Sequence, residues 1–442
     1  MENLLEEKVK PLYLRYLSAA FGSALISSIY GLVDMAMVGQ YQGPDGTAAL
    51  AVVAPVWNVI YSLGLLTGIG GSVIFSLKKG MNRDGGKGNG NQYFTSSLIL
   101  SVFLAVLSTA AVFLFEDQIL TFFGADESLL YLAENYLRPI RYVFPVFLFN
   151  QMLASFLRND NNPSLAAAAV LLGGIFNVFG DWFFVFPCDM GMYGAGLATA
   201  AGSVISLIIM LTHFFNKKCT LRLERPSRTL HQASRIVETG FSTFFIDVAM
   251  GILTILFNRQ IMRYLGPSAL AVYGPVINVS TFVQCSAYSV GQASQPIIST
   301  AYGAGRSDRI KETLKYSLIT AFIFAAFWTT LSECVPNLYI RIFMNPTGEI
   351  LTIAPAIIRT YALSFVLLPF NIYSTYYFQA IMKSRVSMTV SVMRGLVISG
   401  ALILTLPLLL PASSIWLSMP LTELITAVYV AAEMKKYTSI LE

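Results

Sequence analysis

The sequence predicts an all-α polytopic membrane protein of about twelve transmembrane helices in two six-helix lobes. Its composition is the first indication: of 442 residues, 55% are hydrophobic and only 12% are charged, whereas soluble domains carry about 25% charged residues. The second is the length of apolar runs such as "SLILSVFLAVLSTAAVFLF", which reach the roughly 20 residues that cross a bilayer. The third is an internal repeat that relates the two halves of the chain.

Apolar runs and the polar breaks between them predict the individual spans. We expect these near residues 16–39, 47–77, 93–115, 131–157, 162–186, 193–215, 236–262, 268–300, 315–340, 354–382, 387–409 and 413–434. Several exceed the length that a bilayer needs, so we expect tilted helices or interfacial ends. The chain opens with "MENLLEEKVKPLYLRYL", which lacks the basic start of a signal peptide, and the first span is therefore expected to be retained.

Loop charges predict the orientation of the spans. If the N-terminus is cytoplasmic, roughly 22 of the 29 Lys and Arg residues lie on that side, as the positive-inside rule requires. They include those of the loop "LKKGMNRDGGKGNG" and of the linker "NKKCTLRLERPSRTLHQASR". The opposite loops carry acids such as Asp126 and Asp189. Both termini are therefore expected in the cytoplasm.

The repeat is readable in the sequence itself. "ALAVVAPVWNV" (Ala49–Val59) recurs as "ALAVYGPVINV" (Ala269–Val279), 220 residues later. An even number of spans per repeat leaves both halves in the same orientation, which predicts a parallel repeat about an axis along the membrane normal. We expect an N-terminal lobe at 1–215, a cytoplasmic linker at 216–235 and a C-terminal lobe at 236–442, with a central cavity suited to alternating access.

Polar residues inside the predicted spans are the candidates for a functional site, because an ionisable group there costs about 2.5–3.5 kcal/mol on insertion scales. Asp34 lies in the first span and Asp181 in the fifth. Asn177 is four residues before Asp181 and so shares its helix face, and Thr199 adds a hydroxyl from the sixth span. An oxygen-rich site of this kind could exchange a proton or bind a small hard cation such as Na+. Alternatively, Asn177 and Asp181 only cap or hydrogen-bond a break in the helix, and Asp34 faces a water-filled vestibule on the outer side.

The second half carries fewer intramembrane acids. Asp247 in the seventh span is a possible cavity acid, and functional and structural interpretations are equally balanced for it. Glu423 and Arg394 are expected to be structural partners of each other. The segment that corresponds to Asp181 has no carboxylate, so acidic chemistry is concentrated in the first half.

Histidine and cysteine do not suggest a metal centre. His213 and His231 are the only histidines, which argues against a His-rich site. Without CxxC spacing, we expect the cysteines to be small apolar fillers. They are Cys188, Cys219, Cys285 and Cys334. No cofactor is expected, and the only metal considered is Na+ at the intramembrane acids.

Several stretches resemble the multidrug and toxic compound extrusion (MATE) family, of the bacterial or archaeal type. They are "YGLVDMAMVG", "FLRNDNNPSL", "NVFGDWFF", "GMYGAGLATAAGSVIS", "GQASQPIISTAYGAG" and "YYFQAIMKSRVS". The resemblance covers essentially the whole chain. It implies two six-helix lobes around a V-shaped cavity, and export of amphipathic, usually cationic compounds driven by Na+ or H+ entry across the plasma membrane. It also implies that the family's N-lobe cation site corresponds to Asp34, Asn177, Asp181 and Thr199.

The chain departs from the family pattern at two places. Many prokaryotic members have a proline within the first span, whereas here Pro11 precedes the predicted span and only Gly22 and Gly31 could soften it. Some members have a glutamate in the seventh span, whereas here the acid is Asp247, at a different turn.

We therefore expect a monomeric secondary active multidrug efflux transporter, not an enzyme, that lies in the lipid bilayer and exports organic cations or drugs in antiport with H+ or Na+. A flippase for lipid-linked precursors is the first alternative, although more spans and a basic cavity would be expected. An intramembrane transferase is the second, although clustered Asp motifs for Mg²⁺-diphosphate chemistry are not visible. The net charge of +5 follows from the loops on one face, so no nucleic-acid partner is expected.

Overall fold

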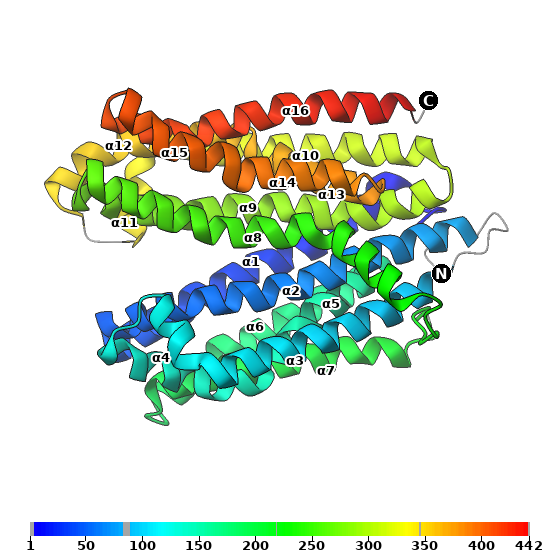
Figure 1. Ribbon diagram of the computed structural model, residues 1–442, viewed down its shortest axis with the longest axis horizontal. Helices are drawn as coiled ribbons and strands as arrows, with labels where there is room; N and C mark the ends of the chain where they lie inside the picture. The colour runs from blue at the N-terminus through cyan, green and yellow to red at the C-terminus, as the bar shows by residue number, and fades with distance from the viewer. Residues whose placement is uncertain (1–3, 83–88, 218, 344–345, 441–442) are drawn as a thin grey trace. The chain divides into compact units, whose positions relative to one another are not determined.

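A computed structural model describes residues 4–82, 89–217, 219–343 and 346–440 (Figure 1). Over these ranges the chain forms helices joined by short connections and contains no strand. It divides into two compact units, one consisting mainly of Ser18–Phe244 and the other of Lys8–Leu17 and Phe245–Glu442. Residues 83–88, which belong to one of the basic loops used to predict the orientation, lie outside the described residues.

The first unit is built from the helices of the first half, which run alongside one another in Figure 1. They are α1 (Val9–Gln42), α2 (Pro44–Asn82), α3 (Gly90–Phe122), α4 (Glu127–Ile140), η1 (Arg141–Val143), α5 (Phe144–Asn159), α6 (Pro163–Val185), α7 (Gly191–Leu211) and η2 (Thr212–Phe215). The unit also takes in the linker and the start of α8 (Thr229–Tyr264), up to Phe244.

The second unit contains the remainder of α8 and the helices that follow it. They are α9 (Pro267–Gly303), α10 (Ser307–Cys334), α11 (Pro336–Phe343), α12 (Gly348–Ala362), η3 (Leu363–Val366), α13 (Leu368–Ala380), α14 (Ser384–Val392), the π-helical turn η4 (Met393–Val397), α15 (Ile398–Leu409), η5 (Ala412–Leu417) and α16 (Ser418–Ile440). The first residues of α1 also belong to this unit.

The helices confirm a polytopic membrane protein. Eleven helices, or pairs of helices joined end to end, are long and apolar enough to cross a bilayer within the described ranges. The 37-residue α9 provides a twelfth element of sufficient length. It contains no charged residue, and most of its C-terminal half is buried in its unit. The predicted all-α fold of about twelve spans in two units is therefore confirmed.

Prolines explain where the helices differ from the predicted spans. The first helix begins at Val9, so Pro11 lies in its first turn, where the missing N–H removes no helical hydrogen bond. The ninth span was predicted to continue to residue 340, but α10 ends at Cys334. Pro336 starts the separate helix α11, because proline restricts the residue before it and cannot continue the hydrogen-bond ladder.

Two predicted spans are interrupted at corresponding places in the repeat. The fourth is broken by η1 before Pro145, and the tenth by η3 before Pro369. A proline near the start of the following helix needs no intrahelical N–H. Tightening the chain into a 3₁₀ turn just before it retains most backbone hydrogen bonds. Each span thus continues across the break as one membrane-crossing segment.

Small residues let the helices of the first unit approach closely, as is common in membrane bundles. A Cβ atom added to Gly64 on α2 would lie 2.6 Å from the backbone oxygen of Leu148 on α5. On α6, a Cβ at Gly173 would lie 2.6 Å from the oxygen of Gly202 on α7. In addition, the Ser206 hydroxyl on α7 donates to the Ala169 oxygen at 2.9 Å. These contacts set the spacing of the helices that carry the predicted site.

Candidate functional site

The structure brings the four predicted site residues of the first unit together. Asp34 comes from α1, Asn177 and Asp181 from α6, and Thr199 from α7. The amide nitrogen of Asn177 donates to Asp181 Oδ1 at 3.4 Å and to Thr199 Oγ1 at 3.1 Å. Asp34 is 8% exposed and Asp181 is fully buried, and the two are close enough for the charge of one to act on the other.

Tyr136 on α4 is a fifth member of this site, and the sequence analysis missed it. Its hydroxyl donates to Asp34 Oδ2 at 2.7 Å and lies within reach of Thr199. Gly196 on α7 makes this possible, because it contacts the backbone oxygen of Tyr136 where no side chain would fit. The only sequence signal was the glycine-rich start of α7, which allows a close neighbour but does not say which one.

The site has more buried oxygen atoms than protein donors. Asp34 Oδ1, Asn177 Oδ1 and Asp181 Oδ2 are buried, and none accepts a hydrogen bond from the described part of the chain. Leaving such atoms unpaired in a low-dielectric interior costs roughly 1–3 kcal/mol each, and more for charged groups. Hard oxygen ligands of this kind suit Na+ by the same logic that governs other hard cations, and a proton on either carboxylate would also supply a donor. The residues therefore fit either coupling ion.

Tight packing of α6 against α7 holds the site together. A Cβ at Gly180, beside Asp181, would lie 2.9 Å from the Ala198 side chain, beside Thr199. Because side chains four residues apart lie one above the other on a helix, Asn177 and Asp181 face the same neighbour. The Asn177 amide thereby links Asp181 to Thr199 across this close helix interface.

The possible cavity acid of the second half lies in a different setting. Asp247 on α8 is half-buried in the second unit, and the Tyr288 hydroxyl of α9 donates to its Oδ1 at 3.2 Å. Asp247 thus has a hydroxyl partner on the neighbouring helix.

Arg394 and Glu423 are ion-pair partners, as predicted. The guanidinium Nη2 lies 2.7 Å from Glu423 Oε1, and Nε lies 2.8 and 3.0 Å from the two carboxylate oxygens. Asn371 on α13 also donates to this carboxylate, at 2.7 Å. The buried Glu423 is therefore fully compensated, in contrast to Asp34 and Asp181.

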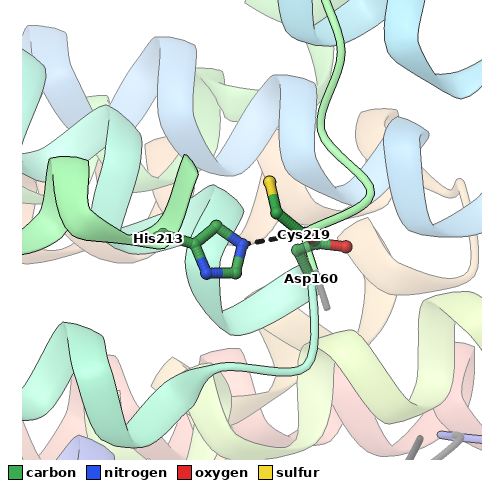
Figure 2. A group of neighbouring side chains, drawn as sticks. All are labelled: Asp160, His213 and Cys219. Atoms are coloured by element: carbon green, nitrogen blue, oxygen red, sulfur yellow. Dashed lines mark hydrogen bonds and ion pairs between the residues drawn. The ribbon is translucent and has the colours of Figure 1, made fainter. Parts of the chain in front are cut away.

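A second cluster of chemically active side chains lies at one end of the first unit (Figure 2). Asp160, at the end of α5, faces His213 in η2 and Cys219 in the linker. Their potential ligand atoms all lie within 4.8 Å of one another. By residue type, this group could bind a transition metal, a site that the sequence analysis did not anticipate.

Hydrogen bonding indicates that this cluster is a structural anchor. The Asn162 side-chain oxygen caps α6 by accepting from Leu165 N at 3.3 Å, so its amide nitrogen donates to His213 Nδ1 at 3.0 Å. The histidine proton is then on Nε2, which donates to Asp160 Oδ2 at 2.8 Å. A metal would need this nitrogen without its proton.

The fold and the site together define a class of protein: a polytopic membrane transporter with an oxygen-lined site buried among its spans. The MatE family model matches the chain twice, at residues 19–183 and 241–403. The chain therefore belongs to the MatE family of multidrug and toxic compound extrusion transporters, and it is not an enzyme. The resemblance predicted from sequence motifs is confirmed, and the double match agrees with the internal repeat.

Curated relatives and solved structures agree with this membership. The multidrug export protein MepA of Staphylococcus saprophyticus is 24% identical over 383 residues, which cover 85% of this chain and 82% of MepA. The probable multidrug resistance protein YoeA of Bacillus subtilis is 23% identical, with 72% and 71% covered. A MATE family transporter of the MOP superfamily in an outward-facing conformation matches with a TM-score of 0.90 at 21% identity, covering 99% of this chain and 98% of that one. A MOP superfamily transporter from Pyrococcus furiosus matches with a TM-score of 0.89, 21% identity and the same coverage.

Proposed function

We propose that this protein exports amphipathic, cationic compounds across the plasma membrane in antiport with H+ or Na+. The observation that carries the proposal is the pair of buried carboxylates, Asp34 and Asp181, surrounded by oxygen atoms for which the described chain supplies no donor. The names of the relatives MepA and YoeA, a multidrug export protein and a probable multidrug resistance protein, support drug export. A MATE structure in complex with MaD3S supports binding of a ligand.

The proposed mechanism follows from charge compensation. Two carboxylates in a shared low-dielectric site repel each other, so the site favours uptake of one positive charge. If the outward-open state binds that ion better than the inward-open state does, ion binding shifts the equilibrium between them. A cationic drug and the ion compete for the same negative potential, which links release of one to binding of the other.

The acidic character of the site favours an organic cation over the phosphate group of a lipid-linked precursor. Phosphate recognition would call for arginine or lysine groups free to pair with it. One buried arginine of the second unit, Arg394, is already paired with Glu423. The flippase alternative is therefore less well supported than drug export.

Efflux measurements on neutralised variants test the proposal. We expect Asp34→Asn and Asp181→Asn to lower gradient-driven dye efflux from proteoliposomes by about tenfold or more, which corresponds to roughly 1.4 kcal/mol of lost coupling. Asp308→Asn is the matched control, because this acid is exposed and pairs with Arg306 at the surface. Wild-type efflux by both site variants would refute the assignment. Imposing a pH gradient and a Na+ gradient separately identifies the coupling ion.

The proposed orientation, with both termini in the cytoplasm, can be tested with native cysteines. Cys188 and Cys334 are exposed and lie at or just beyond span ends that the positive-inside rule places outside the cell. Cys219 lies in the basic linker. A membrane-impermeant maleimide should label Cys188 and Cys334 in intact cells but label Cys219 only after permeabilisation. The reverse pattern would invert the topology.

A further inference from the structure

The last two spans of the second unit hold a buried ion pair. Arg394 is 7% exposed and Glu423 is fully buried. Three guanidinium contacts of 2.7–3.0 Å and the Asn371 amide at 2.7 Å saturate the carboxylate. Arg394 lies in the five-residue π-helical turn η4, a feature that often marks functional positions in helices.

The repeat has a definite register at this place. Gly395 follows Gly174 by 221 residues, which agrees with the spacing of the two segments that the family model matches. A Cβ at Gly174 would lie 3.1 Å from Ile26 on α1, the first long helix of its unit. A Cβ at Gly395 would lie 3.0 Å from Ala249 on α8, the corresponding helix of the other unit. The two glycines therefore occupy equivalent positions.

The residues that precede these glycines differ in chemistry. Gly173 has no side chain, and it packs directly against the backbone of α7 at Gly202. Its counterpart Arg394 extends instead to Glu423 on α16, the last span of its own unit. In the first unit, the two helices at this place are in direct backbone contact. In the second unit, a guanidinium group lies between the corresponding helices.

We propose that Arg394 is a tethered cation that permanently fills a cation site formed by Glu423 and Asn371. Arginine stays protonated in proteins, and its planar group matches a carboxylate in two contacts, so it neither titrates nor leaves. The Asn371 side chain borders this site, because its amide nitrogen donates to the Glu423 carboxylate. In consequence the Arg394–Glu423 pair exchanges no ion during transport, a conclusion that rests on the proposed antiport.

Removing the guanidinium should open the site to a free cation. Arg394→Ala leaves the fully buried Glu423 carboxylate without its counter-ion, which is strongly destabilising, and leaves a space of the shape of the lost group. Guanidinium ion at low millimolar concentration, far below denaturing levels, is the probe. It should bind there and stabilise the folded state by mass action.

Thermal unfolding of the purified, full-length protein tests this binding. Guanidinium chloride should raise the melting temperature of the Arg394→Ala variant by several degrees relative to the same concentration of choline chloride. It should not raise that of the wild type, in which the site is filled, or of the R394A/E423Q variant, which lacks the carboxylate. No shift in Arg394→Ala, or an equal shift in the double variant, would overturn the proposal. Because no transport is measured, this result is independent of the proposed antiport.

A second measurement decides the matter if Arg394→Ala does not fold. The R394M/E423Q variant replaces the pair with neutral groups, a change that buried ion pairs often tolerate. If the pair exchanges no ion, this variant should keep the ion concentration for half-maximal dye efflux within about twofold of the wild-type value, well under 1 kcal/mol. A larger shift, at unchanged protein stability, would show that Glu423 takes part in ion exchange and would refute the tethered-cation role. Loss of ion dependence in the wild type itself would instead refute the antiport.

Discussion

Replacing Asp160 with asparagine should weaken the anchor that holds the linker to the first unit. The Asp160 side chain is fully buried and accepts hydrogen bonds from Lys79 Nζ at 2.9 Å and His213 Nε2 at 2.8 Å. Thr220 in the linker donates to it through both its backbone nitrogen, at 2.8 Å, and its hydroxyl. One carboxylate thus joins the ends of α2, α5 and α7 to the linker.

The pKa of Asp160 gives the magnitude of this effect. Burial alone would raise this pKa, but the hydrogen bond from His213 and the charge of Lys79 outweigh it and lower the pKa to about 2. An unfolded aspartate has a pKa of about 3.9. A difference of this size contributes about 2.6 kcal/mol to the free energy of unfolding at neutral pH. We therefore expect Asp160→Asn to destabilise the protein by about 2–3 kcal/mol at pH 7.

The pH dependence distinguishes this cause from a simple packing defect. Because the folded pKa is depressed, the stabilisation is fully present above the unfolded value near pH 4 and is lost as pH falls towards about 2. The difference in unfolding midpoint between the wild type and Asp160→Asn should be constant from pH 7 to about pH 5 and then narrow in acid. Denaturation of the purified protein, followed at several pH values, measures it.

An exposed ion pair provides the control for this experiment. Asp308 forms an ion pair with Arg306 at 2.8 Å, but its side chain is 63% exposed. Surface pairs contribute about 0–1 kcal/mol, so Asp308→Asn should have little effect. If Asp160→Asn is no more destabilising than Asp308→Asn at pH 7, or if its deficit persists unchanged in acid, the hydrogen-bonded anchor is not the cause.

Two further substitutions test the ion site of the first unit. Gly196→Ala should destabilise the protein by about 1–3 kcal/mol through overpacking, because its Cβ would lie 3.0 Å from Pro139 and closer still to the Tyr136 oxygen. Gly22→Ala is the control, since a Cβ there meets no atom within 4 Å. Equal melting temperatures for the two variants would contradict the close packing at Gly196. Tyr136→Phe keeps the ring but removes the hydrogen-bond donor to Asp34. Since hydrogen bonds to charged groups contribute about 1.5–3 kcal/mol, the rate of dye efflux at a sub-saturating concentration of the coupling ion should fall about tenfold. An unchanged rate would exclude Tyr136 from the site.

The membrane fold could be predicted from the sequence because its cause is local. Backbone groups in lipid must be satisfied within the segment, so each long apolar run specifies a helix by its own composition. The same reasoning identified Asp34 and Asp181, since an acid within such a run is costly wherever the helix is placed. Asn177 followed from helical periodicity alone. The ends and breaks of helices at Pro336 and before Pro145 were less accessible, because a proline within an apolar run does not say whether the helix stops, kinks or continues.

Contacts between distant segments were decided by the tertiary structure. Tyr136 is one of 22 tyrosines in the chain, and it joins the site only because Gly196 lets α4 approach α7. Asp160 was visible in the stretch "FLRNDNNPSL", but its three partners come from α2, η2 and the linker. The equivalence of Gly173 and Arg394 likewise requires the packing of each following glycine against its own first helix. Hydrophobicity and periodicity are properties of one segment and can be deduced from its residues. The contact partner of a side chain depends instead on how the helices pack, which is set by small residues at interfaces throughout the bundle.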